Sequence, residues 1–171
     1  MTLVDHKDEI LKSVANRFDF ENPPCDPVEL FDKLKSIMIE KEALGLAAPQ
    51  IGIPLRVFVF GSPYDPNNIS VAFNPMLVDS SGDTILRGEG CLSFPDLYIM
   101  IKRQDSIRVR YTTQNNVTNT IKFEGMTSRV FQHELDHLNG ITFDKVATKF
   151  HLERAKKQAK LVRRRRNGNT Q

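Results

Sequence analysis

Two histidines and a glutamate within five residues are the strongest chemical signal in the sequence. They are His133, Glu134 and His137, in the run QHELDH. In a helix, the two imidazoles lie on one face about one turn apart, so both can reach a single divalent metal ion. Glu134 can then take a proton from a water molecule that the metal activates. The alternative is a helix whose polar residues simply face solvent. However, the apolar residues Phe131 and Leu138 continue the histidine face toward the interior, where an unpaired pair of imidazoles would be costly to bury.

A third ligand decides which kind of metal site this is. In the pattern HExxHxxGxxH the third ligand is a histidine, but this chain has Phe143 at that position. In other HExxH sites the third ligand is a glutamate from a later helix. The only later glutamate here is Glu153, which lies in a strongly basic segment and is a poor candidate. The remaining soft ligands are Cys25, Cys91, His6 and His151. Cys91 lies in the run GEGCLS, whose glycines let the backbone approach an ion closely, whereas Cys25 at a helix entry is more typical of a structural cysteine. One cysteine with two histidines leaves a fourth position for water, as catalytic sites do.

Three separated segments resemble the three signature motifs of peptide deformylases. They are GLAAPQ at residues 45–50, EGCLS at residues 89–93 and QHELDH at residues 132–137. They occur in the family's order with family-like separations, and the resemblance covers roughly residues 26–148. It implies a metal-dependent hydrolase that removes the formyl group from the N-terminal formylmethionine of nascent polypeptides and releases formate.

The resemblance also implies a role for each residue of the site. Cys91, His133 and His137 would hold the metal, and Glu134 would carry the proton from the attacking water to the departing amine. The side-chain amide of Gln50 and the backbone N–H of Leu92 would stabilise the oxyanion of the tetrahedral intermediate.

The peptide substrate needs an apolar slot for methionine and a backbone to lie along. Three residues beside the motifs are candidates for the slot: Leu44, Met126 and Val130. Gly45 and its neighbours would pair with the peptide backbone as a strand does. Glu89, the acidic residue that opens the second motif, would orient the site, and an ion pair with Arg103 or Arg129 is an equally good interpretation.

The ligand chemistry leaves the metal open. Cysteine and histidine suit Zn²⁺ and Fe²⁺ equally on grounds of softness. The resemblance favours Fe²⁺, with Zn²⁺, Ni²⁺ or Co²⁺ able to substitute. Two rival classes are a zinc peptidase that acts on unformylated peptides and a non-catalytic ribosome-binding protein with a structural metal. Glu134 and Gln50 argue against the second class, because a structural site needs neither.

Length and composition indicate a soluble, cytoplasmic protein. The 171 residues suffice for one domain with a core, and 40% hydrophobic and 26% charged residues are ordinary for a globular chain. There is no run of eighteen apolar residues, and the first residues are too acidic for a signal peptide. Two cysteines make no disulfide framework.

Charge divides the chain into two parts. Residues 149–171 hold nine Lys or Arg and one Glu, a net charge of +8, and the rest carries −5. We therefore expect a catalytic domain at residues 1–148 and a basic C-terminal helix and tail at residues 149–171. The tail suggests a polyanionic partner, which for an enzyme of nascent chains would be the ribosome, although a solvated charge run is the common alternative. No membrane contact is expected.

Hydrophobic patterning predicts an α+β fold. Helices are expected near Ile10, Leu11 and Val14, over residues 27–41 with Asp26 as the N-cap, around the HExxH run, and over residues 148–165. Short strands are expected at residues 56–60, 69–73, 76–79, 98–101, 107–111 and 117–123, with a turn at residues 80–83. Thr127 or Ser128 is expected to cap the HExxH helix. The result is a mainly antiparallel sheet packed around that central helix, with an N-terminal helix and a C-terminal helix.

Overall fold

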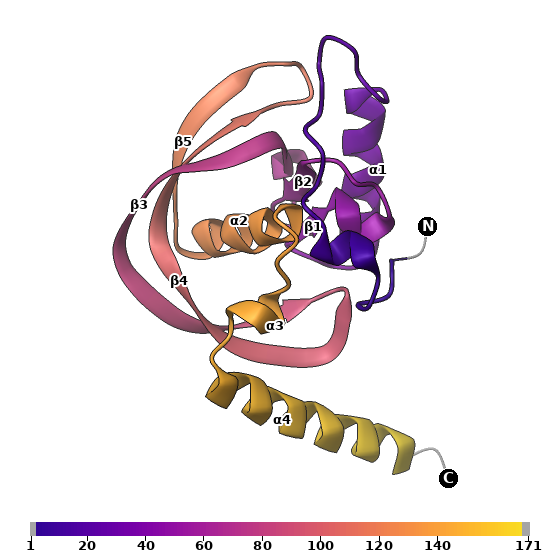
Figure 1. Ribbon diagram of the computed structural model, residues 1–171, viewed down its shortest axis with the longest axis vertical. Helices are drawn as coiled ribbons and strands as arrows, with labels where there is room; N and C mark the ends of the chain where they lie inside the picture. The colour runs from indigo at the N-terminus through magenta and orange to yellow at the C-terminus, as the bar shows by residue number, and fades with distance from the viewer. Residues whose placement is uncertain (1–2, 169–171) are drawn as a thin grey trace.

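A five-stranded antiparallel sheet curls around a central helix (Figure 1). The computed structural model describes residues 3–168. The strands are β1 (Gly45–Ala47), β2 (Val57–Phe60), β3 (Ser70–Cys91), β4 (Phe94–Thr112) and β5 (Thr118–Glu124), in that order across the sheet. Every neighbouring pair is antiparallel, which the sequence predicts, because the connections are short.

Four α-helices and three short 3₁₀ turns complete the described residues. The α-helices are α1 (Pro27–Glu40), α2 (Gly125–Leu138), α3 (Phe143–Val146) and α4 (Lys149–Gly168). The 3₁₀ turns are η1 (Glu9–Lys12), η2 (Ala48–Ile51) and η3 (Pro66–Asn68). The predicted α+β fold, with a central HExxH helix and helices toward both ends, is confirmed. The predicted cap is also confirmed, since Asp26 Oδ1 accepts hydrogen bonds from the N–H groups of Val28 and Glu29 at 2.8 and 2.9 Å.

The two longest strands correct the prediction of several short ones. Apart from Ile69, the segments expected at residues 69–73 and 76–79, and the turn expected at residues 80–83, lie within the single strand β3. The pairing register between β3 and β4 shifts between Phe73 and Met76, and again between Ser81 and Thr84. The turn-forming residues at these points therefore produce bulges that bend the strand without reversing it. The segments expected at residues 98–101 and 107–111 merge into β4 in the same way.

The N-terminal segment departs from the predicted helix. Only η1 is helical there; Leu11 is fully buried, but Val14 is 69% exposed. Beyond η1 the chain is extended, because its backbone pairs with other segments: the N–H of Ala15 donates to the carbonyl of Leu138 at 2.9 Å, and Asn16 bridges to Leu55. These contacts tie the N-terminal segment to the C-terminal end of α2 and to the residues just before β2.

Helix α2 begins without the side-chain cap that the sequence predicts. Its first residue is Gly125, with φ of +60°, and neither Thr127 nor Ser128 is the N-cap. Ser128 lies inside the helix, where its hydroxyl donates to the carbonyl of Gln104 at 2.9 Å. The bond attaches the helix to β4 instead of satisfying its own first turn. The helix ends at Asn139 and Gly140, as expected.

Aromatic packing fixes the rotation of α2 within the curled sheet. Phe131 is fully buried and meets Phe58 and Phe60 of β2 edge to face, with ring centroids 4.8 and 5.5 Å apart. Leu138 is fully buried in the same cluster. With these residues anchored, the face of α2 that carries the HExxH residues is turned toward the end of β3.

Helix α4 lies outside the curled sheet, below the first part of β4 (Figure 1). Ala155 and Ala159 are buried, but Val162, expected on the same apolar face, is 50% exposed. The expected helix end near Arg165 falls close to the observed end. Within residues 3–168 no helix is long and apolar enough to cross a membrane.

Candidate metal centre and substrate cavity

Three side chains from two distant segments converge at one point. The thiol of Cys91, at the end of β3, and the imidazoles of His133 and His137, on α2, each offer a ligand atom, and these atoms lie within 4.8 Å of one another. Cys91 Sγ is 3.3 Å from His137 Nε2, and ligand atoms around a tetrahedral ion are about 3.5 Å apart. The residues predicted as ligands are thus brought together in a geometry that fits one ion, whereas Cys25 is exposed elsewhere.

Glu89 orients one of these ligands. Its Oε2 lies 3.0 Å from His133 Nδ1, which leaves Nε2 of that ring for the metal. Its carboxylate also accepts from Arg103 at 3.0 and 3.1 Å and from Arg129 at 2.6 Å. The sequence left open whether Glu89 orients the site or pairs with one of two arginines, and in the structure its carboxylate contacts His133 and both arginines.

Charge pairing keeps Glu89 ionised although it is buried. Burial alone would raise its pKa, but the hydrogen bonds from His133 and Arg103 and the charge of Arg103 lower the pKa to about 2. Asp136, which sequence reasoning missed, holds the other side of the Arg103 guanidinium. Its position on α2, three residues after His133, is the signal that could have identified it.

The electrostatics of the two histidines indicate a place for a cation. Burial, followed by the charges of His133 and Arg103, lowers the pKa of His137 well below its usual value, so this imidazole is neutral, as a metal ligand must be. Burial would also lower the pKa of His133, but the hydrogen bonds to Cys91 and Glu89 and the charge of Glu134 raise it to about 10. The acidic groups around His133 therefore favour positive charge, which a divalent ion can supply in place of a proton.

Glu134 lies beside this centre with a free carboxylate oxygen. The residue is 4% exposed, and its Oε2 has no hydrogen-bond partner among the described residues. Burial, with the charges of Glu89 and Asp136 and against that of His133, raises the pKa of Glu134 to about 7. A Cβ on Gly45 would lie 2.5 Å from Glu134 Oε1, so the absence of a side chain there makes room for the carboxylate.

Gln50 directs its amide nitrogen toward the same point. Its Oε1 accepts from the N–H of Ala47 at 2.8 Å, which assigns the orientation of the amide. Its Nε2 then faces Cys91 Sγ at 3.6 Å and Ser93 Oγ at 3.3 Å. Ser93 is buried and holds the amide from the far side, a function that the sequence prediction missed although the residue closes the EGCLS motif.

A cavity of about 630 Å³ opens beside the centre. All five residues predicted to bind substrate line it: Leu44, Gly45, Glu89, Met126 and Val130. Gln50, Leu92, Cys91, His133 and Glu134 also line it, whereas His137 is not part of its surface.

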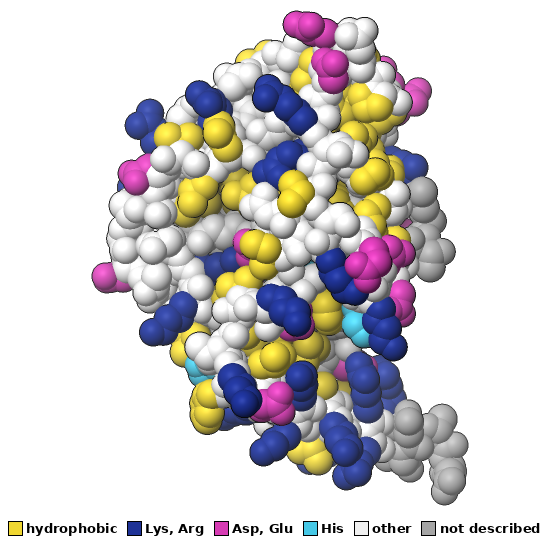
Figure 2. Space-filling model, in the orientation of Figure 1, with side chains coloured by type: hydrophobic (Ala, Val, Ile, Leu, Met, Phe, Trp, Pro, Cys, Tyr) yellow, Lys and Arg dark blue, Asp and Glu magenta, His cyan; other side chains and the backbone are white. Residues whose placement is uncertain are grey.

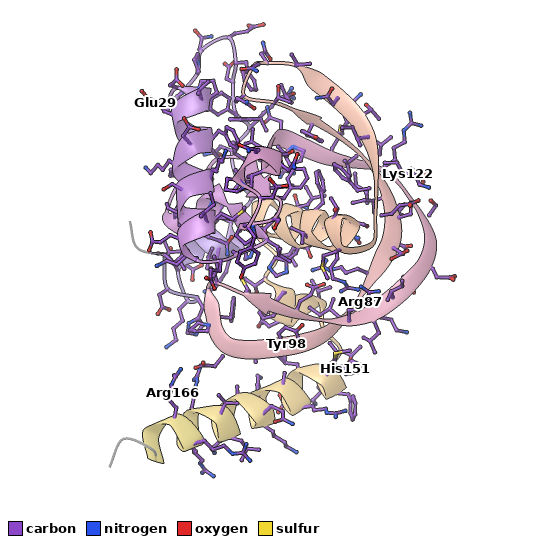
Figure 3. The ribbon with its side chains drawn as sticks, turned by 180° about the vertical axis from the view of Figure 1, so that it is seen from behind. Glu29, Arg87, Tyr98, Lys122, His151 and Arg166 are labelled. Carbon is purple, nitrogen blue, oxygen red and sulfur yellow. The ribbon has the colours of Figure 1, made fainter. Side chains whose placement is uncertain are left out.

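One side of the cavity was not predicted. It is formed by residues 94–98 at the start of β4, called here the wall segment. Tyr98 belongs to it and is labelled in Figure 3 between the sheet and α4. A Cβ on Gly88 would lie 2.0 Å from the Tyr98 ring, so the glycine of β3 lets this ring lie against the strand. The pairing of β3 with β4 brings these residues to the site, and no local sequence pattern predicts that position.

Comparisons with known proteins agree with this geometry. The family model described as "Polypeptide deformylase" matches residues 1–152. The chain is 33% identical over 161 residues to "Peptide deformylase 1" of Bacillus anthracis, covering 90% of this chain and 96% of that protein. It is 40% identical over 124 residues to the peptide deformylase of Thermotoga neapolitana, covering 67% of this chain and 73% of that protein.

Solved structures lead to the same family. A peptide deformylase from Plasmodium falciparum superposes with a TM-score of 0.85 at 27% identity, covering 99% of both chains. A peptide deformylase from Synechococcus elongatus, solved in complex with actinonin, gives 0.83 at 29% identity, covering 92% of this chain and 86% of that one. The fold, the convergence of the three motifs and the matched length together show that this chain belongs to the polypeptide deformylase family.

Proposed function

We propose that this deformylase removes the formyl group from N-terminal formylmethionine with a metal ion held by Cys91, His133 and His137. The observation that carries the proposal is the convergence of these ligand atoms with a buried carboxylate and a directed amide at one edge of an open cavity. A divalent ion in such a site supplies Lewis-acid chemistry, which makes water nucleophilic near neutral pH and polarises a carbonyl.

Glu134 carries the proton in this mechanism. A carboxyl with a pKa of about 7 exists in both protonation states near neutral pH, so it can accept a proton from water and then donate it. Its unpartnered Oε2 is the atom that accepts the proton. The departing amine receives the proton, which leaves formate and a free N-terminal methionine as the products.

Gln50 and Leu92 stabilise the negative charge that develops on the formyl oxygen. The Gln50 amide is held by Ala47 with its N–H groups toward Cys91, so it needs no reorientation during the reaction. The backbone N–H of Leu92, the residue after Cys91, is the proposed second donor. Both residues line the cavity in which the substrate would lie.

The substrate lies with its methionine side chain among Leu44, Met126 and Val130. Leu44 and Met126 are 44% and 49% exposed and line the cavity, so a ligand can cover apolar surface that is otherwise in water. The peptide backbone pairs along Gly45, whose strand β1 stands at the edge of the sheet with one side unpaired.

Formate release tests this function most simply. The purified protein should release formate from a formyl-Met tripeptide and leave the peptide bonds intact. The same tripeptide without the formyl group is the control. Cleavage of an internal peptide bond, without formate, would instead identify a peptidase.

Iron is the proposed native metal, with Zn²⁺, Ni²⁺ or Co²⁺ as substitutes. A thiolate with two imidazoles suits both Fe²⁺ and Zn²⁺, so ligand type alone does not choose between them. Protein purified without oxygen should contain one iron per chain, and its activity should decline in air as iron is lost. Full activity in a protein that contains only zinc and gains nothing from added Fe²⁺ would contradict iron as the native metal.

We further propose that the protein works in the cytoplasm, where residues 149–171 bring the catalytic domain of residues 1–148 to the ribosome. Lys and Arg side chains gather along α4 at the lower end of Figure 2, with Arg154, Lys157 and Arg165 among the exposed ones. Residues 169–171 of this tail lie outside the described part. Contacts with RNA phosphates release counterions, so ribosome binding should weaken steeply as salt rises.

Charge removal on α4 tests this docking. Changing Arg154, Lys157 and Arg165 to Ala together should reduce co-sedimentation with ribosomes at low salt. Truncation after Val162 is a less specific test, because Arg163 and Arg166 contact Asp96 in the wall segment. The triple variant should retain its kcat/KM on a formyl-Met tripeptide, since none of the three residues lines the cavity. Unchanged ribosome binding would leave α4 without a docking role.

A further inference from the structure

A second cavity lies on the other side of the wall segment. Its volume is about 950 Å³, and it runs between the start of β4 and one face of α4. Phe94, Pro95 and Leu97 form part of its apolar surface, together with Leu152 and Ala159 of α4. We call it the α4 groove.

The α4 groove adjoins the substrate cavity. Phe94, Pro95 and Leu97 line both, so the wall segment is the boundary that the two cavities share. Between them Asp96 is held in a left-handed conformation with φ of +67°. A peptide that leaves the substrate cavity across this wall would enter the groove within a few residues, because an extended chain advances about 3.3 Å per residue.

Ion pairs with α4 hold the wall in place. The guanidinium of Arg163 donates to Asp96 Oδ2 at 3.1 Å and to the carbonyl of Pro95 at 3.0 Å. Arg166, which Figure 3 labels on α4, donates to both carboxylate oxygens of Asp96 at 3.2 Å. The wall segment, attached to α4, therefore separates the two cavities, and α4 forms the opposite side of the groove.

The rim of the groove is strongly basic. Four cations line it, all from α4: Lys156, Lys160, Arg163 and Arg164. Asp144 is the one carboxylate among the lining residues. Arg163 pairs with Asp96 and Lys156 with Glu153, but Lys160 and Arg164 have no ion-pair partner in the described part of the chain. Clustered like charges beside an apolar surface attract acidic groups.

We propose that the α4 groove binds the part of the formylated polypeptide that follows its first few residues, and that it favours acidic side chains there. The inference rests on the proposed deformylase function and adds a substrate preference to it. The apolar floor and the wall segment shared with the substrate cavity favour a peptide as the occupant, because a nucleic acid backbone gains nothing from burying Phe94 and Leu97. Lys160 and Arg164 are the residues that would form ion pairs with the acidic side chains.

Two formyl-Met decapeptides of the same length provide the test. One carries Glu at residues five, six and eight, and the other carries Lys there, and a formyl-Met tripeptide serves as the short substrate. The wild-type protein should show kcat/KM about five- to tenfold higher on the acidic decapeptide, through KM, since each exposed ion pair contributes a few tenths to about 1 kcal/mol.

Charge reversal on the groove should remove this preference. We expect the double variant K160E/R164E to prefer the basic decapeptide. The matched control K157E/R165E makes the same change of charge at exposed positions that line neither cavity, and it should keep the wild-type preference. All three proteins should have equal kcat/KM on the tripeptide.

Several outcomes would overturn the proposal. Equal kcat/KM of the wild-type protein on the two decapeptides is one, and an equal loss of preference in K160E/R164E and K157E/R165E is another, because it would reflect the general field of α4. Reduced ribosome co-sedimentation of K160E/R164E with unchanged peptide kinetics would assign the groove to the ribosome. Anisotropy of the two labelled decapeptides measures binding without turnover, so failure of the deformylase function, seen with the tripeptide, is a separate result.

Discussion

Close contact between Gly45 and Glu134 shows how a single missing side chain can matter to the chemistry. The Glu134 carboxylate occupies the space where a Cβ on Gly45 would be, 2.5 Å from Oε1, so the two residues constrain each other although 89 positions separate them. Glu134 is not part of the group of possible ligand atoms, which is formed by Cys91, His133 and His137. Acid–base chemistry and metal binding should therefore be separable by mutation.

Glu134→Ala should retain the metal and lose several orders of magnitude in kcat. The reason is that, in the proposed mechanism, the carboxylate moves the proton but does not hold the ion. Metal content by mass spectrometry, alongside formate release, checks both halves of this expectation. If the variant lost its metal, Glu134 would have to be counted among the ligands.

Gly45→Ala should lower kcat about a hundredfold or more while the metal stays bound. The added methyl group cannot coexist with the carboxylate in its present position, and a displacement of about 1 Å can cost that much in catalysis. Thermal unfolding of the variant is the control for folding. An unchanged kcat would mean that Glu134 is free to move without consequence.

Gln50→Leu should lower kcat about a hundredfold or more with a modest change in KM, because its donor acts mainly on charge that develops in the transition state. Gln50→Glu is the matched variant: it keeps an acceptor for the Ala47 N–H but replaces the donor. Both variants should be impaired. Full activity in Gln50→Glu would mean that Gln50 only holds its own loop in place and donates no hydrogen bond that the reaction needs.

At the scale of elements, α2 and the end of β3 are joined by one buried ionic network. Glu89 of β3 contacts His133 and Arg129 of α2 and Arg103 of β4, and Arg103 contacts Asp136 of α2. Arg103 and Arg129 are about 6% exposed. A buried charge network of this kind keeps the proposed ligand His133 in place only while each charge has its partner.

Glu89→Gln should destabilise the protein by about 3 kcal/mol or more, because it keeps the shape but leaves Arg129 without a carboxylate partner. Chemical denaturation of the metal-free proteins measures the difference. Since the pKa of Glu89 is lowered to about 2, its contribution is fully present above about pH 4.5 and is lost as the pH falls toward 2. The wild-type protein should thus lose its advantage over the variant in that window, and a difference that persisted at pH 2 would contradict the ionic origin.

The sequence predicts which residues lie close together better than it predicts the elements that carry them. His133, Glu134 and His137 are fixed by spacing within one helix, and the helix forms as expected. The long strands were divided, because turn-forming residues such as Asn74 and Gly82 give the same local signal in a bulge as in a turn. Ser93 and the wall segment were missed for a different reason: their positions depend on contacts between segments far apart in the sequence, which the local pattern does not contain.

For the whole molecule, the separation of charge follows the separation of structure. The sequence places a net charge of +8 on residues 149–171 and −5 on the remainder, and the described part of this basic segment forms α4, outside the curled sheet. Arg163 and Arg166 attach α4 to the wall of the substrate cavity through Asp96. A partner that binds α4 therefore acts close to the substrate entrance, where a nascent chain would arrive.

Metal content and formate release of two cysteine variants test the central claim, that this chain deformylates with the ion held by the proposed ligands. Cys91→Ala, purified without oxygen, should lose both its bound metal and its formate release on a formyl-Met tripeptide. Cys25→Ala is the matched control, and it should keep both, because Cys25 is exposed and absent from the ligand group. Metal and activity retained in Cys91→Ala but lost in Cys25→Ala would contradict the account.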